Sequence, residues 1–190
     1  MIPKLVFLQD CVILDACCII NLYASGRMGD ILRSLASSAA VAAYVRDEET
    51  IRIYSGSSEQ AKKYEMINLE PFIACNLLTI VSPESRAENN TFVRFAATLG
   101  NGEAVTGAIA LHRNWSICSD DRKAVAFFAR NTPHLQLIST LELVKHWVDT
   151  SDVSFAIVHE ALHNMRIQAR YAPIANHKLY GWWKRYNEPQ

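Results

Sequence analysis

The stretch CVILDACCIINLYASGR, residues 11–27, predicts the fold of this chain. It begins as a short apolar run that ends at Asp15, and a second apolar segment then continues toward Gly26. The first run fits a buried strand at 11–15, and the second fits a helix from about 17 to 25. A buried strand that feeds directly into a helix is the repeating unit of an α/β fold with a parallel sheet.

The same alternation continues along the chain. The pattern predicts strands near 39–43, 77–81, 115–118 and 135–139, and helices near 29–37, 84–99, 101–113, 122–131, 141–148 and 152–171. Ser82 or Ser85 is the expected cap of the helix near 84–99, and Gly100 is its expected stop. Strands that alternate with helices predict a central parallel sheet covered by helices on both faces.

Length and composition favour one domain with a sizeable core. The chain has 190 residues, of which 50% are hydrophobic and 20% are charged, and its formal net charge is zero. We expect residues 1–150 to form the α/β domain and residues 151–190 a helical extension packed on it. The zero net charge excludes a polyelectrolyte, but the basic C-terminal end, with five Lys or Arg against one Glu over residues 161–190, suggests an anionic partner.

The cysteines and the N-terminus bear on the compartment. There are five Cys, Cys17 and Cys18 are adjacent, and no C-x-x-C pair is present. We interpret them as buried, reduced thiols of a cytoplasmic protein. Asp10 and Asp15 interrupt the N-terminal apolar stretches before they reach the length of a signal peptide or a membrane span.

Acidic side chains stand where the predicted strands end or the next helices begin. Asp15 ends the first strand, Glu48 opens the helix after the second, and Glu103 lies in the first turn of the helix that begins NGEA. Asp120 and Asp121 follow the strand WSIC. Because the carboxyl ends of parallel strands meet at one edge of the sheet, we expect these acids to converge.

A bound divalent cation would explain such a cluster. Carboxylates repel one another and are costly to bury unpaired, and Mg²⁺ and Mn²⁺ prefer oxygen ligands. Each acid alone has an ordinary interpretation as a helix cap or dipole partner. Four segments that deliver acids to the same edge favour a Mg²⁺ or Mn²⁺ site instead, of the kind that suits phosphodiester hydrolysis.

Three stretches resemble the motifs of PIN-domain nucleases. VILDACCIINLYASG, residues 12–26, resembles their opening, and VAAYVRDE, residues 41–48, resembles their second acidic motif. LGNGEAVTGAIALHRNWSICSDDRKA, residues 99–124, resembles the third and fourth motifs in order. The resemblance runs from about residue 10 to 150. It implies a PIN-like α/β/α sandwich with a central, mostly parallel sheet, and a Mg²⁺- or Mn²⁺-dependent endoribonuclease similar to the toxins of VapBC-type toxin–antitoxin modules.

The resemblance also implies roles for the acids. Asp15, Glu103 and Asp121 hold the metal, with Asp120 beside them, and Glu48 completes the catalytic set. The fourth acid could be Asp120 or Asp121, and the family spacing favours Asp121. The third acid is a Glu where Asp is commoner in the family.

One position near the first acid departs from the family pattern. The residue two after that acid is commonly Ser, Thr or Asn, and here it is Cys17. A thiol is a weaker hydrogen-bond donor than a hydroxyl, so this change affects the fine geometry of the expected site.

The segment HEALH, residues 159–163, matches the H-E-x-x-H pattern of zinc proteases. A zinc site needs a third protein ligand, and the extended spacing H-x-x-G-x-x-H fails because Arg166 and Ala169 stand at its last two positions. A zinc peptidase is therefore a remote alternative.

A helical interpretation accounts for this segment without zinc. An apolar stripe would pack on the domain and a neighbouring basic stripe would face solvent or RNA. The apolar stripe includes Ile157, Val158, Leu162 and Met165, and the basic stripe is His159, His163, Arg166 and Arg170. The tail LYGWWKRYNEPQ, residues 179–190, could stack on bases, but two adjacent Trp more often dock onto a core or a partner.

Besides the remote zinc peptidase, these observations lead to one expected function and one main alternative. The first is a metal-dependent endoribonuclease that hydrolyses RNA, the toxin of a toxin–antitoxin pair, with an antitoxin protein as partner and a homodimer as its assembly. The alternative is a PIN-type module that has the same fold, is catalytically inactive and binds nucleic acid or protein.

Overall fold

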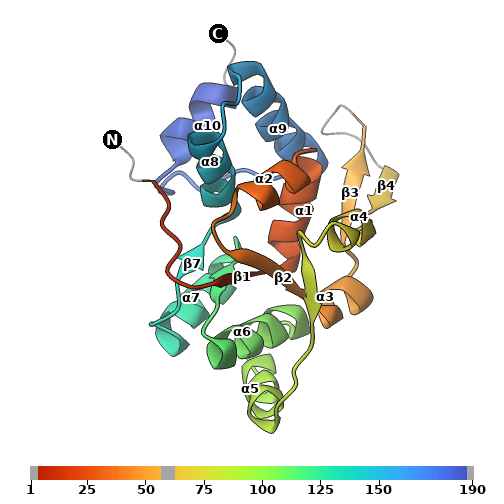
Figure 1. Ribbon diagram of the computed structural model, residues 1–190, viewed down its shortest axis with the longest axis vertical. Helices are drawn as coiled ribbons and strands as arrows, with labels where there is room; N and C mark the ends of the chain where they lie inside the picture. Colours follow the sequence, from red (N-terminus) through yellow and green to blue (C-terminus); the bar gives the residue numbers. More distant parts are fainter. Residues whose placement is uncertain (1–3, 57–62, 188–190) are drawn as a thin grey trace.

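The computed structural model describes residues 4–56 and 63–187. A five-stranded sheet lies between two layers of helices (Figure 1), which confirms the α/β class and the general α/β/α sandwich. All strand pairs in this sheet are parallel, in the order β5-β2-β1-β6-β7. The strands are β1 Cys11–Leu14, β2 Ser38–Ala42, β5 Thr79–Val81, β6 Ser116–Cys118 and β7 Leu137–Ile138.

The position of the central strand β1 indicates where a ligand site is expected. All four of its residues are buried, as expected for a strand covered on both faces, and Leu14 pairs with Val41 on one side and Cys118 on the other. The chain reaches β2 directly after β1 but reaches β6 only after β5, so the order of strands reverses between β1 and β6. Ligand sites in open α/β sheets form beyond the carboxyl ends of the strands at such a reversal.

Helices cover the two faces of the sheet. One face carries α1 Ala16–Ala24, α2 Met28–Ser34 and α8 Thr140–Thr150, and the other carries α5 Arg86–Ala96, α6 Asn101–Arg113 and α7 Arg122–Asn131 (Figure 1). The short helices α3 Ala43–Glu48 and α4 Glu70–Ala74 lie between strands. An antiparallel hairpin of β3 Arg52–Ser55 and β4 Lys63–Met66, which the sequence did not predict, packs near α1 and α9.

The C-terminal extension forms α9 Phe155–Gln168 and α10 Tyr180–Asn187, and α9 packs against α1 and α10. Val158, Leu162 and Met165 are fully buried, as the predicted apolar stripe requires. Trp182 and Trp183 are 7% and 5% exposed, so the aromatic tail docks back onto the core.

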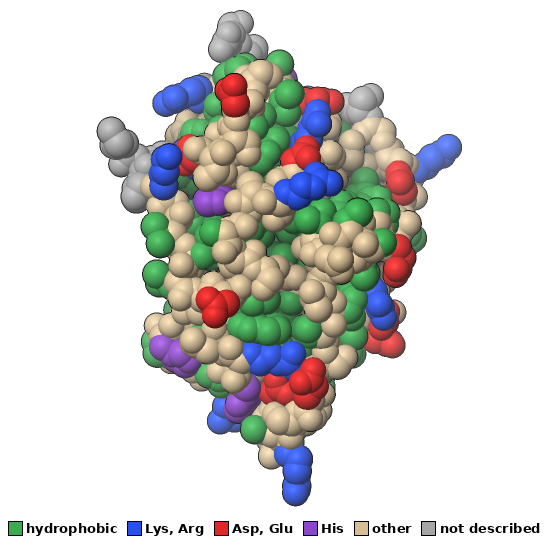
Figure 2. Space-filling model, in the orientation of Figure 1, with side chains coloured by type: hydrophobic (Ala, Val, Ile, Leu, Met, Phe, Trp, Pro, Cys, Tyr) green, Lys and Arg blue, Asp and Glu red, His purple; other side chains and the backbone are tan. Residues whose placement is uncertain are grey.

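The surface carries mixed charge. Figure 2 shows Lys and Arg side chains scattered among Asp and Glu on the face it presents, without an extended region of one sign. Among the described residues no helix combines the length and the apolar composition needed to cross a bilayer.

Candidate functional site

Asp15 lies directly after β1, beside the reversal of strand order between β1 and β6, and caps α1. Its Oδ1 accepts from the Ala16 N–H at 2.8 Å, and its Oδ2 accepts from the Ser119 hydroxyl at 2.9 Å. The side chain is buried. Burial raises the pKa of Asp15, and the negative charge of Asp121 raises it further, against the opposing effect of the hydrogen bonds.

Glu103 reaches the same edge from the first turn of α6. Its Oε2 accepts from the Gly100 N–H at 3.0 Å, so the carboxylate caps its own helix. Burial raises the pKa of Glu103, as do the nearby charges of Asp15 and Asp121, while the Gly100 N–H acts in the opposite direction. The charges of Asp15, Glu103 and Asp121 are therefore close enough to influence one another, and their role as ligands of one metal ion stays a prediction.

Asp121 completes this group from the start of α7. It is the N-cap residue, and its Oδ1 accepts from the Ala124 N–H at 2.8 Å. The Asp121 N–H lies 3.3 Å from the Ser119 oxygen, while the Ser119 hydroxyl donates to Asp15. Ser119 thus links two acids that follow adjacent strands.

The position of Glu48, the predicted acid after the second strand, differs from the prediction. Helix α3 begins at Ala43, directly after β2, so Glu48 is its last residue and does not open it. Glu48 is exposed and lines a shallow pocket with Tyr44. The acid brought to the site is Glu49, whose extended backbone leads it out of α3. Burial raises the pKa of Glu49, and the charges of Asp15 and Glu103 add to the effect.

Glu49 reaches the site because Gly102 has no side chain. The Gly102 N–H faces the Glu49 carboxylate and lowers its pKa, against the larger effect of burial. A Cβ built on Gly102 would overlap Oε1 of Glu49. We name Asp15, Glu49, Glu103 and Asp121 the acid cluster.

We expect Gly102→Ala to displace the Glu49 carboxylate and weaken cation binding while the fold survives, because the overlapping atom is the end of a flexible side chain. Alanine is also the better helix former, by about 1 kcal/mol. Gly29→Ala is the matched control: Gly29 holds the same second position in α2, and a Cβ there meets only ordinary contacts, the nearest at 3.6 Å. Titration with Mn²⁺ measures the effect, and equal affinities in the two variants would contradict it.

Asp120 faces away from the acid cluster. Its Oδ1 accepts from the Thr140 N–H at 3.1 Å, and its Oδ2 accepts from the Asn21 amide at 2.9 Å and from the Thr140 hydroxyl. Burial raises its pKa, and these hydrogen bonds oppose the shift. Asp121 is turned toward the acids by its role as N-cap, so the neighbouring Asp120 points to the other side of the chain. These contacts hold Asp120 beside Thr140 and Asn21, and its predicted place beside the metal ligands stays a prediction.

A second group with ligand atoms close together lies behind Asp15. Among the described residues, Cys17, Cys18 and Asp120 have ligand atoms within 4.8 Å of one another and could hold a metal ion. Cys118 donates to Cys18 at 3.2 Å. Burial raises the pKa of Cys118 to about 11, and that of Cys18 well above the usual range. The thiols are protonated at neutral pH, so a metal must displace protons to bind them.

The acid cluster is more open than this group. In the part of the chain that the structure describes, no three of its carboxylates have oxygens within 4.8 Å of one another. Like charges hold the side chains apart, and a cation between them would remove that repulsion. The arrangement therefore suits hard cations, which bind carboxylate oxygens and retain waters.

Among the residues that the structure describes, the helical segment carrying HEALH does not form a complete zinc site. The His159 and His163 rings stack 6.0 Å apart, and Glu160 faces Arg27 at 3.6 Å. No third Cys, His, Asp or Glu ligand atom joins the two histidines within 4.8 Å over residues 4–56 and 63–187.

The predicted basic stripe is interrupted at its end. Helix α9 ends at Gln168, and Arg170 adopts a left-handed conformation, with φ of 53°. Its guanidinium lies 3.7 Å from the centre of the Tyr54 ring, on the β3–β4 hairpin. Arg170 therefore leaves the surface shared by His159 and His163, because the helix stops before the residue that periodicity assigned to it.

Comparisons with known proteins identify no relative. No protein-family description, no curated protein and no solved structure matches the chain.

Proposed function

We propose that this protein is a divalent-cation-dependent endoribonuclease of the PIN type that hydrolyses RNA phosphodiester bonds. The observation that supports it is the acid cluster: four carboxylates from four separate elements approach one another beyond the carboxyl ends of β1 and β6, and the pKa values of Asp15, Glu49 and Glu103 are raised. Perturbed acids in a common site are typical of functional centres.

The donor chemistry of the acid cluster fits Mg²⁺ or Mn²⁺. Its donors are carboxylate oxygens, which hard cations prefer, whereas the thiols of Cys17 and Cys18 would select softer metals. Asp15, Glu103 and Asp121 would hold the cation, and Glu49 would take the place assigned to Glu48. A cation there supplies positive charge for the scissile phosphate and for the oxygen that leaves it.

Hydrogen bonds within the protein orient the carboxylates of the acid cluster. Ser119 orients Asp15 and fixes its distance from the backbone of Asp121. The Gly100 N–H holds Glu103 in the first turn of α6. These contacts limit the motion of the acids, so less ordering is needed when a cation and a phosphate bind.

The biological setting is proposed from the motifs. The resemblance to VapC-like toxins supports a toxin role, an antitoxin protein as partner, a homodimer and a cytoplasmic location. His159, His163 and Arg166 remain predicted RNA contacts.

Cleavage of a labelled RNA by the purified protein tests the proposal. We expect cleavage with Mn²⁺ or Mg²⁺, loss of cleavage with a chelator, and recovery when Mn²⁺ is added back. If RNA is bound but stays intact with either cation, the alternative of an inactive binding module replaces the nuclease.

We also expect Mn²⁺ to stabilise the protein more at pH 7 than at pH 4.5. The raised pKa values mean that the folded acids bind more protons than the unfolded ones, so stability falls as pH rises through the window above their usual pKa values. A cation removes this penalty, and one present at 100 times its dissociation constant adds about 2.7 kcal/mol. The rise in unfolding temperature caused by Mn²⁺ is measured at both pH values at matched ionic strength. An equal rise at pH 7 and pH 4.5 would contradict the prediction.

A further inference from the structure

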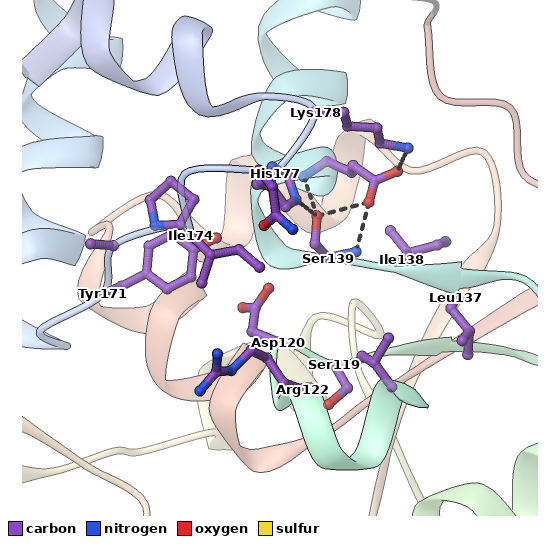
Figure 3. Close-up of a pocket in the computed structure, with 15 residues that line it drawn as sticks. Ser119, Asp120, Arg122, Leu137, Ile138, Ser139, Tyr171, Ile174, His177 and Lys178 are labelled. Atoms are coloured by element: carbon purple, nitrogen blue, oxygen red, sulfur yellow. Dashed lines mark hydrogen bonds and ion pairs between the residues drawn. The ribbon is translucent and has the colours of Figure 1, made fainter. Parts of the chain in front are cut away.

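A cavity adjoins the acid cluster on the side to which Asp120 points (Figure 3). It has a volume of about 430 Å³, within the range of small-molecule sites. The loop after β6, strand β7 and the first turns of α7 and α8 form one side, and the segment 171–178, which connects α9 to α10, forms the other. The C-terminal extension is therefore part of its wall.

The walls of the cavity are mainly apolar. They include Val125, Leu137, Ile138, Tyr171, Pro173 and Ile174. Ile174 is 46% exposed, which is unusual for a large aliphatic side chain at the edge of a cavity. The Tyr171 ring stands beside it and offers a flat surface (Figure 3). These walls suit a planar ring better than a strongly hydrated ligand.

The inner end of the cavity carries an acceptor with spare capacity. The Asp120 carboxylate points into the space between Ile174 and Ser139 (Figure 3). Its Oδ2 already accepts from Thr140 and Asn21, but its Oδ1 accepts only from the Thr140 N–H among the described residues. Since a carboxylate oxygen accepts two hydrogen bonds, Oδ1 has room for one donor from a ligand.

Two basic side chains also line the cavity. Arg122 lines the cavity from the first turn of α7 and is exposed. Lys178 lines it from the other side, where its ammonium group pairs with Glu142 at 2.5 Å. A ligand that fits thus offers a donor on a flat ring to Asp120 and an anion to Arg122. A nucleotide has both.

We propose that this cavity binds one guanine nucleotide of the RNA strand and directs cleavage to the neighbouring phosphodiester, an inference that rests on the proposed function. Asp120 and Asp121 are consecutive, and their side chains serve the cavity and the acid cluster respectively. A base in the cavity therefore places its strand next to the acids. Guanine is favoured because its Watson–Crick edge carries a ring N–H beside an amino group, either of which can donate to Oδ1 of Asp120.

Binding of the four nucleoside 5′-monophosphates in the presence of a chelator tests the cavity without any cleavage. We expect saturable binding of GMP, weaker binding of AMP and CMP, and the weakest binding of UMP. Ile174→Asp should weaken GMP binding by about tenfold or more, because it places a charge at the apolar mouth. Val93→Asp is the matched control, since Val93 is exposed on α5 and lies outside the cavity.

A second pair of variants tests the contribution of Arg122. Arg122→Ala should weaken GMP binding but leave guanosine binding unchanged, because guanosine lacks the phosphate. Arg130→Ala, at the far end of α7 from Arg122, should change neither. No saturable binding of any nucleotide, or equal GMP binding by wild type and Ile174→Asp, would overturn the inference.

Mapping the cut ends of a random-sequence RNA separates this inference from the function on which it rests. We expect guanine enriched at one fixed position beside the cut in the wild type, and no enrichment in Ile174→Asp. Cation-dependent cleavage without base preference would overturn the inference and leave the nuclease standing. GMP binding without any RNA cleavage would overturn the nuclease, and with it the assignment of the guanine to an RNA strand.

Discussion

Glu103→Gln should lower cation-dependent RNA cleavage by at least about 100-fold, a loss typical of removing one group from a catalytic set. The change deletes one negative charge from the acid cluster and keeps the shape of the side chain. The amide oxygen can still accept from the Gly100 N–H, so the cap of α6 survives. Repulsion of Asp15 and Asp121 is relieved, and the folded protein should be as stable as the wild type or more so.

The measurement combines cleavage rates in Mn²⁺ with thermal unfolding in a chelator. Glu84→Gln is the control, because the Glu84 side chain is 79% exposed and interacts with Arg113 far from the cluster. Loss of cleavage together with loss of stability would show that Glu103 matters through folding. Full cleavage activity in Glu103→Gln would show that the acid cluster does not catalyse RNA cleavage.

The parallel sheet could be predicted because its signals are local. The apolar run before Asp15 and the periodic segment after it correspond to β1 and α1 within one residue. The hairpin was missed because Lys63–Met66 is exposed throughout and shows no buried face. Its pairing with Arg52–Ser55 comes from contacts that composition does not reveal.

The positions of the acids were predicted less accurately than those of the strands. Asp15, Glu103 and Asp121 occupy caps or first turns, where the side chain's direction follows from the backbone, so their convergence could be expected. Glu49 lies one residue beyond a six-residue helix, and only the close approach of Gly102 shows that it turns inward. The direction of Asp120 depends on Thr140, twenty residues later in the chain, which no local pattern indicates.

The role of the C-terminal extension follows from its packing. Periodicity correctly assigned Val158, Leu162 and Met165 to the buried side of α9. One wall of the cavity beside Asp120, however, is formed by the irregular segment that follows α9, where side-chain periodicity gives no information. Under the proposed function, this segment supplies one wall of the nucleotide cavity in addition to any stability that its packing contributes.

Glu88→Gln should destabilise the protein by about 3 kcal/mol at pH 7, the lower end of the cost of breaking a buried ion pair. Glu88 is buried; its Oε1 accepts from Arg113 Nε at 2.7 Å, and its Oε2 accepts from the Glu84 and Ser85 N–H groups. Burial raises its pKa, but the Arg113 hydrogen bond and the backbone donors outweigh this and lower the pKa to about 2. A glutamine can satisfy these donors with one oxygen only, because its amide NH₂ faces them as another donor.

The pH dependence has the opposite sign to that of the acid cluster. A lowered pKa gives stability that is complete above the usual pKa of Glu and is lost as pH falls toward about 2. Denaturant unfolding at pH 7 and pH 3 should therefore show a large difference between wild type and Glu88→Gln at pH 7 and a smaller one at pH 3. Because Glu88 and Arg113 join α5 to the end of α6 remote from Glu103, cation-dependent cleavage by the folded variant at low temperature should persist. A variant as stable as the wild type at pH 7 would show that this ion pair adds nothing to the fold that positions Glu103.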